Sequence, residues 1–261
     1  MISLAVLFFF TAAAFSALGL GGGAVYVPLL IAHKVPFHLA VASSQAVIVA
    51  VSISALLLYH RAGYVDWKLV LLIEPATDLG ALLGGYFSHH VPDDVGKIIF
   101  ATVVSAGAVL MLRPMPERSA PSREGFAYWV RSVGDEVYTV NWVVTLPLMV
   151  LAGLLSGFLG IGGGMLKVPL LILACRVPVK LAVGSSTVMI GITSLTGLIG
   201  HAAAGYFDAT LFLPLAAAGL VGAQIGARFS VRTDRRHLKL GFGVMLLLVA
   251  LWVSWGVLHP A

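Results

Sequence analysis

The stretch Gly19–Ile31, GLGGGAVYVPLLI, decides the fold, because it interrupts an apolar N-terminal segment with four glycines. A second copy, GIGGGMLKVPLLI, covers Gly160–Ile172 and repeats the glycines, the Val-Pro pair and the closing Leu-Leu-Ile. Each glycine run precedes about ten apolar residues, which as a helix span about 15 Å, half the hydrocarbon core of a bilayer. We therefore expect two glycine-broken, half-length helices, over residues 24–33 and 165–174.

The two copies belong to a repeat that runs through the chain. A shift of 141 residues (160 − 19) superposes the motifs, and after a one-residue slip a shift of 142 (185 − 43) aligns residues 43–44 with 185–186. Many further matches follow in the same register. This register predicts two homologous halves, 1–112 and 141–261, joined by a polar linker over 113–140.

The composition is that of a membrane protein. Of the 261 residues, 59% are hydrophobic and only 10% are charged, and the mean hydropathy is +1.00, whereas soluble domains carry about 25% charged residues. We therefore expect an all-α polytopic membrane protein, which contacts the lipid bilayer and no nucleic acid. Besides the two half-length helices, the expected helices are 4–18, 39–59, 69–88, 97–112, 142–159, 181–200, 209–229 and 239–257.

Lysine and arginine indicate how the halves lie in the membrane, since these residues accumulate in cytoplasmic loops. Loop 60–68 carries Arg61 and Lys68, whereas its counterpart 201–209 carries neither residue type. The 113–140 linker adds four arginines. Equivalent loops thus differ in charge, which predicts inverted repeats with the linker in the cytoplasm and both termini outside the cell.

The glycine runs form the first candidate binding site. Glycine lets the backbone turn sharply, and the free N–H groups that open the following helix favour an anion. A broken, half-length helix in both halves also indicates a transporter site. Close helix packing is the alternative, and it is our interpretation of the GxxxG pairs at 80–84 and 222–226. The candidate positions are Gly21, Gly22, Gly23, Gly162, Gly163 and Gly164.

Two polar trios recur at matching positions near the starts of long helices. Their hydroxyl and amide groups can donate hydrogen bonds to an oxyanion, although hydrogen bonding between helices is the alternative. The trios are Ser43, Ser44 and Gln45 in the first half, and Ser185, Ser186 and Thr187 in the second. Lys167 has Tyr26 at its equivalent position, and it either attracts the anion or extends to the membrane surface along its stem.

Glu74 and Asp78 also break the repeat, with Ala216 and Leu220 at the equivalent positions. Counted from Lys68, they lie about 9 and 15 Å along a helix of 1.5 Å per residue. Carboxylates at this depth are costly and often relay protons, so we expect them to couple transport to protons. The alternatives are neutral acids hydrogen-bonded in the bundle, or pairing with Lys167 or a histidine.

The duplicated GxGGGxxxVPxL-type motif in about 260 apolar residues resembles the TauE/SafE family of membrane proteins, over essentially the whole chain outside the linker. The resemblance implies a transporter, often an exporter, of sulfite, sulfonates or related small oxyanions, in the bacterial plasma or inner membrane. The helix N-termini fit such an anion independently of the resemblance.

The sequence leaves three classes of function open. A secondary anion transporter is favoured, and an anion channel would use the same helix ends without a coupling ion. An intramembrane enzyme would need a nucleophile with a base, or a metal cluster, at one depth, and the sequence indicates no such group, no metal site and no cofactor. Cys175 is the single cysteine and excludes an intramolecular disulfide. No sequence feature indicates an oligomeric state.

Overall fold

The computed structural model describes residues 2–112 and 125–234 and, beyond them, residues 237, 240, 241, 244, 247, 248, 251 and 252. In chain order its elements are α1 (Ile2–Ala17), α2 (Gly23–Ala32), α3 (Phe37–Arg61), α4 (Trp67–Phe87), η1 (Ser88–His90), α5 (Asp93–Leu112), β1 (Tyr128–Val133), β2 (Glu136–Asn141), α6 (Trp142–Leu159), α7 (Gly164–Leu173), α8 (Val179–Ala203) and α9 (Ala209–Arg232). The helix expected over 239–257 and the linker residues 113–124 lie largely outside the described residues.

Local sequence sets where the long helices begin. Asp66 caps α4 and Asp208 caps α9, each accepting hydrogen bonds from the backbone amides two and three residues later. Pro36 and Pro178 stand directly before α3 and α8, where the missing N–H group removes no bond within the helix. Residues that the 142-residue shift aligns therefore start equivalent helices.

Two glycine turns separate α1 from α2 and α6 from α7. We call Gly19–Gly23 the first glycine turn and Gly160–Gly164 the second. Three glycines in each turn have positive φ, a conformation that strains any residue with a Cβ atom. The helices that follow, α2 and α7, have ten residues each. The φ angles are 68°, 74° and 91° at Gly19, Gly21 and Gly22, and 70°, 69° and 77° at Gly160, Gly162 and Gly163.

The GxxxG pairs let helices from the two halves of the chain touch backbone to backbone. A Cβ atom on Gly84 of α4 would lie 2.9 Å from the carbonyl carbon of Leu154 in α6. A Cβ atom on Gly226 of α9 would lie 2.8 Å from the carbonyl carbon of Ala13 in α1. Real Cβ atoms essentially never approach so closely, so the packing interpretation of the two GxxxG pairs is confirmed.

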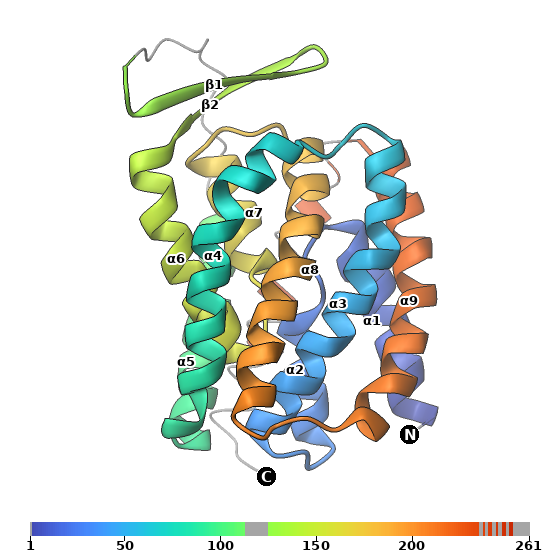
Figure 1. Cartoon of the computed structure of the whole chain (residues 1–261). Coiled ribbons are helices and arrows are strands. Elements are labelled where there is room, and N and C mark those ends of the chain that lie inside the picture. Colours follow the sequence, from blue (N-terminus) through green and yellow to red (C-terminus); the bar gives the residue numbers. More distant parts are fainter. Residues whose placement is uncertain are drawn as a thin grey trace.

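The helix α3 runs toward the β1–β2 hairpin, and α8 runs beside it in the opposite direction (Figure 1). Gly197, late in α8, faces Gln45, early in α3. Gly184, early in α8, faces Tyr64, just after α3 ends. The hairpin lies at one end of the bundle and the N-terminal end of α1 lies at the other (Figure 1).

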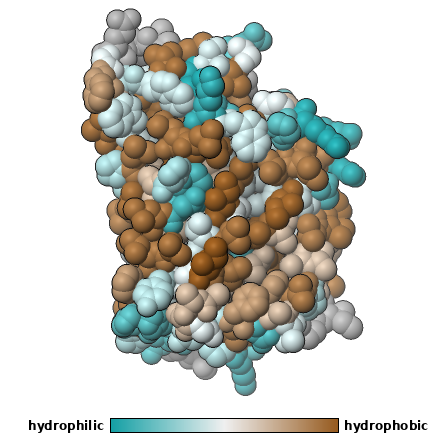
Figure 2. Space-filling view, viewed as in Figure 1, coloured by the Kyte–Doolittle hydropathy of each residue, from teal (hydrophilic) through white to brown (hydrophobic). Residues whose placement is uncertain are grey.

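Five helices within the described ranges are long and apolar enough to cross a membrane. Hydrophobic side chains cover much of the middle of the molecule, and hydrophilic ones gather mainly toward its two ends (Figure 2). The protein is therefore a multi-pass, mostly α-helical membrane protein. The five spans are Phe37–Arg61, Trp67–His90, Trp142–Leu159, Val179–Ala203 and Ala209–Arg232.

The part of the linker that the structure describes forms an antiparallel hairpin of β1 and β2, and Asp66 ties this hairpin to the bundle. Arg131 of β1 donates hydrogen bonds of 2.9 and 3.1 Å to the two Asp66 carboxylate oxygens, and Tyr138 of β2 donates a third of 2.5 Å. Burial opposes ionisation of the Asp66 carboxyl, but the hydrogen bonds from Arg131, Tyr138 and the Leu69 amide outweigh it and lower its pKa. Asp66 thus stays ionised and holds the hairpin at the start of α4.

Candidate functional site

The first and second glycine turns lie against each other in the buried interior. A Cβ atom on Gly23 would lie 2.6 Å from the Cα atom of Ile161, and one on Gly164 would lie 2.7 Å from the carbonyl oxygen of Leu20. Every residue of both turns is buried. The first amides of a helix have no carbonyl partner within that helix, so the N-terminal ends of α2 and α7 bring two such sets of amides close together in the protein interior.

Two of the predicted polar residues hold the opposite glycine turn in place. The Ser44 hydroxyl in α3 donates a hydrogen bond of 3.0 Å to the Gly160 carbonyl oxygen. The equivalent Ser186 hydroxyl in α8 donates one of 3.3 Å to the Gly19 carbonyl oxygen. The alternative of hydrogen bonding between helices therefore describes these two contacts, and substrate contact by either serine stays a prediction.

The other members of the trios are also buried, with varied partners. The Gln45 amide donates to the carbonyl oxygens of residues 156 and 157, and Thr187 donates to the Val183 carbonyl oxygen in its own helix. The Ser185 hydroxyl accepts a hydrogen bond of 2.9 Å from the backbone amide of Asp66. The Ser43 hydroxyl has no hydrogen-bond partner within the described residues.

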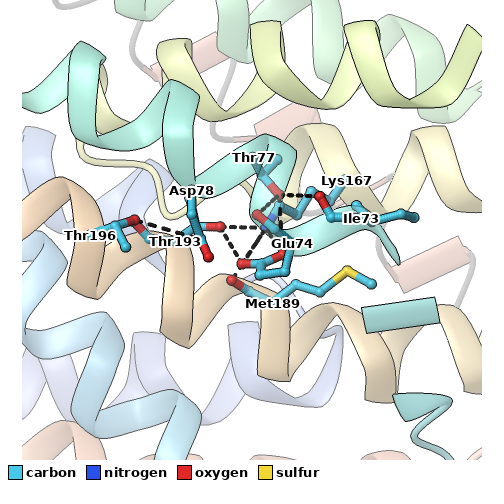
Figure 3. A network of polar contacts seen from close by, with 8 residues as sticks. All are labelled: Ile73, Glu74, Thr77, Asp78, Lys167, Met189, Thr193 and Thr196. Atoms are coloured by element: carbon cyan, nitrogen blue, oxygen red, sulfur yellow. Dashed lines mark hydrogen bonds and ion pairs between the residues drawn. The ribbon is translucent and has the colours of Figure 1, made fainter. Parts of the chain in front are cut away.

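Lys167 of α7 forms an ion pair with Glu74 of α4 deep in the bundle (Figure 3). Its ammonium nitrogen lies 3.0 and 2.8 Å from the two Glu74 carboxylate oxygens, and it also donates to the Met189 carbonyl oxygen at 3.2 Å. Thr193 of α8 completes the network by donating to Glu74 at 2.6 Å. Lys167 is 0% exposed and Glu74 3% exposed, so Lys167 does not extend to the membrane surface.

Asp78 lies one turn beyond Glu74 on α4, at the edge of this network (Figure 3). It is half-buried, and its carboxylate accepts a hydrogen bond of 3.4 Å from the Thr196 hydroxyl of α8. Glu74 accepts a hydrogen bond from a different threonine, through the Thr77 hydroxyl on its own helix. The two carboxylates thus share one helix face, as expected, while Glu74 alone pairs with Lys167.

Sequence reasoning missed three hydroxyl residues of the site. Thr193 bridges Lys167 and Glu74, and its signal was its position seven residues, or two helical turns, after Ser186 on the same face of α8. Ser156 and Ser194 are fully buried, and their hydroxyls have no hydrogen-bond partner within the described residues. These two serines have no sequence signal of their own, because single serines are common in membrane helices.

The described residues contain no group of three histidine, cysteine or carboxylate side chains that could hold a metal ion. His201 is buried in α8, where its ring contacts the Ser88 hydroxyl and the Gly157 carbonyl oxygen. These contacts hold α8 against α6 and the end of α4, which is a packing role.

Known proteins resemble this chain over most of its length. The model of the family described as sulfite exporter TauE/SafE matches residues 4–253. Two proteins from strains Temecula1 and 9a5c of Xylella fastidiosa, each called a probable membrane transporter protein, are 30% and 28% identical over 92% of this chain and 90% of their own length. The probable membrane transporter protein YunE of Bacillus subtilis is 27% identical over 90% of both chains. No solved structure is significantly similar to this chain.

Proposed function

The chain belongs to the sulfite exporter TauE/SafE family of membrane transporters, and from that membership we propose that it exports a small sulfur or organic oxyanion, such as sulfite or a sulfonate. It is a transporter and not an enzyme. The observation that carries the proposal is the contact of the two buried glycine turns. Free N–H groups at two helix ends suit an anion, because they present donors and the positive end of the helix dipole.

We place the two halves, 1–112 and 141–261, in the membrane as inverted repeats around this site. The opposite directions of α3 and α8 support this arrangement (Figure 1). The exchange of equivalent contacts between the halves supports it as well, since Ser44 holds Gly160 and Ser186 holds Gly19. With the arginine-rich linker in the cytoplasm, both termini lie outside the cell.

Charge balance at Lys167 supports coupling to protons. The ammonium of Lys167 and the carboxylate of Glu74 neutralise each other in a site that water does not reach. An anion that binds near Lys167 adds a negative charge, and an uncompensated buried charge costs several kcal/mol. Protonation of Glu74 removes that cost and frees Lys167 for the anion, with Asp78 as the nearby carboxylate that passes the proton on.

Flux through purified protein in liposomes tests the function. We expect saturable uptake of radiolabelled sulfite that is accelerated by unlabelled sulfite on the opposite side and by a pH gradient. Glu74→Gln should abolish the acceleration by the pH gradient, because the glutamine side chain does not take up a proton at these pH values. Asp78→Asn is expected to slow it.

The same experiment separates the alternatives. Unsaturable flux with large single-channel conductance would indicate an anion channel. Absence of flux for sulfite, sulfonates, thiosulfate and small carboxylates would contradict the proposed substrate class. An unchanged response of both carboxylate variants to the pH gradient would remove Glu74 and Asp78 from the coupling.

A further inference from the structure

We infer that the oxyanion binds asymmetrically, at the second glycine turn, where the hydroxyls of Ser156 and Ser194 contact it together with the first amides of α7. This inference rests on the proposed function and deepens it. It names one helix end and two side chains where the repeat alone would suggest two equivalent ends.

Two buried, unpartnered hydroxyls point at the second glycine turn. A Cβ atom on Gly163 would lie 3.3 Å from the Ser156 Oγ atom, and one on Gly162 would lie 2.9 Å from the Ser194 Oγ atom. Both serines are 0% exposed, and neither Oγ atom has a hydrogen-bond partner within the described residues. A buried hydroxyl without a partner is destabilising, so a ligand oxygen at the glycine turn explains why two such groups stand there.

Lys167 adds positive charge at the same place. A Cβ atom on Gly163 would lie 3.4 Å from the Lys167 Cε atom, so the lysine stem runs past the glycine that opens α7. An oxyanion at this helix end would therefore meet backbone amides, two hydroxyl donors and the charged end of the Lys167 side chain. Hydroxyl, amide and ammonium groups all donate hydrogen bonds, which is what the oxygens of a sulfite or sulfonate accept.

The first glycine turn offers a single hydroxyl, that of Tyr26, and no charged side chain among the atoms nearest to its glycines. Phe15 and Tyr26 occupy the positions equivalent to Ser156 (156 − 141) and Lys167 (167 − 141). The Tyr26 ring lies over Gly22, where a Cβ atom would approach its hydroxyl oxygen to 2.6 Å. A Cβ atom on Gly21 would meet isoleucine methyl groups. An aromatic ring and aliphatic side chains thus surround the N-terminal end of α2, and they offer an anion no charged donor.

Ser52 provides a matched control, because it is the equivalent of Ser194 in the first half (194 − 142). It is 3% exposed, and its hydroxyl also has no partner within the described residues. Replacing Ser52, Ser156 or Ser194 by alanine removes the same atom from a similar environment. The three variants should therefore fold alike, and gel filtration with thermal unfolding checks that they do.

Binding of radiolabelled sulfite to the purified full-length protein tests the inference. We expect Ser156→Ala and Ser194→Ala each to raise the Kd by about 10- to 100-fold, since each removes a hydrogen bond to a charged ligand. Ser52→Ala should change the Kd by less than about twofold, because its hydroxyl is not at the helix end that binds the anion.

Two results would overturn the inference while leaving the proposed function intact. One is wild-type affinity in both Ser156→Ala and Ser194→Ala, as expected if buried water occupies these hydroxyls. The other is an equal loss of affinity in Ser52→Ala, as expected if the two glycine turns bind the anion symmetrically. If the wild-type protein binds neither sulfite nor a sulfonate, the proposed function fails and the inference fails with it.

Discussion

Replacing either Lys167 or Glu74 by a neutral residue should destabilise the protein strongly, because the other side chain is then a buried charge without its partner. The ammonium nitrogen lies 3.0 and 2.8 Å from the carboxylate oxygens, and both side chains are buried. Removal of one partner from such a pair costs about 3–5 kcal/mol. At about 2–4 °C per kcal/mol for a chain of this size, Lys167→Met or Glu74→Gln should lower Tm by about 6 to 20 °C (3 × 2 to 5 × 4).

The double variant separates charge from packing. Lys167→Met combined with Glu74→Gln leaves no ionised side chain in the pair, and replacement of a whole buried pair by neutral groups is often close to neutral in stability. We therefore expect the double variant to lie within about 2 kcal/mol of wild type, and to be more stable than either single variant. Thermal unfolding of the purified protein in detergent measures all four members of this cycle.

The pair Lys97–Asp94 is the control for burial. Its nitrogen–oxygen distance is 2.9 Å, almost the same as in the buried pair, but its side chains are exposed to solvent. Lys97→Met should therefore change the free energy of unfolding by less than about 1 kcal/mol. If Lys167→Met and Lys97→Met have similar effects, or if the two single effects at 74 and 167 simply add, the buried pair does not behave as described.

Three further predictions follow from the packing, the hairpin and the topology. Gly226→Ala should cost about 1–3 kcal/mol because its Cβ would overlap the facing backbone of Ala13. Gly107→Ala should be nearly neutral, because the closest atom to its Cβ is a flexible Met165 side-chain carbon at 3.3 Å and the Met165 carbonyl oxygen lies at 3.5 Å, an ordinary contact distance; thermal unfolding compares the two variants. The pKa of Asp66 is lowered in the folded protein, so its ionised carboxylate should contribute fully to the stability of the hairpin above about pH 3.9, the pKa of an aspartate in the unfolded chain. The contribution should be lost as the pH falls through the lower pKa of the folded state. Proteolysis of the hairpin as a function of pH measures this loss. A cysteine at Ser132, with Cys175 replaced by serine, should react with an impermeant thiol reagent only after cells are opened; labelling in intact cells would place the linker outside.

The sequence was sufficient to predict the features that depend on neighbouring residues. The glycine turns require positive φ, which is a local property of glycine, and both short helices follow them in the structure. Helix ends were less accurate, because a helix begins directly after its cap and not where the uninterrupted apolar run begins. The helix expected from residue 39 starts at Phe37, directly after Pro36.

The partners of buried polar groups were harder to predict, because they depend on how helices from the two halves pack. For Ser44 and Ser186 the sequence left substrate contact and hydrogen bonding between helices open, and it did not show that each donates to a glycine carbonyl more than a hundred residues away in the sequence. The positions of Ser156 and Ser194 at the second glycine turn likewise follow from the packing of α6 and α8 around α7. Periodicity within one helix does not contain this information.

One long-range contact could be predicted from the sequence, because both Lys167 and Glu74 differ from the residues at the equivalent positions of the other repeat. The positions equivalent to Lys167 and Glu74 are Tyr26 (167 − 141) and Ala216 (74 + 142), and these two residues belong to one buried apolar cluster. A buried charge is tolerated only beside its partner, so the lysine and the glutamate must be present together or absent together. Two repeat-breaking residues of opposite charge therefore indicate a contact, even at a separation of 93 residues. The same asymmetry places the positive charge at α7 alone, which is why one helix end and not two is expected to bind the anion.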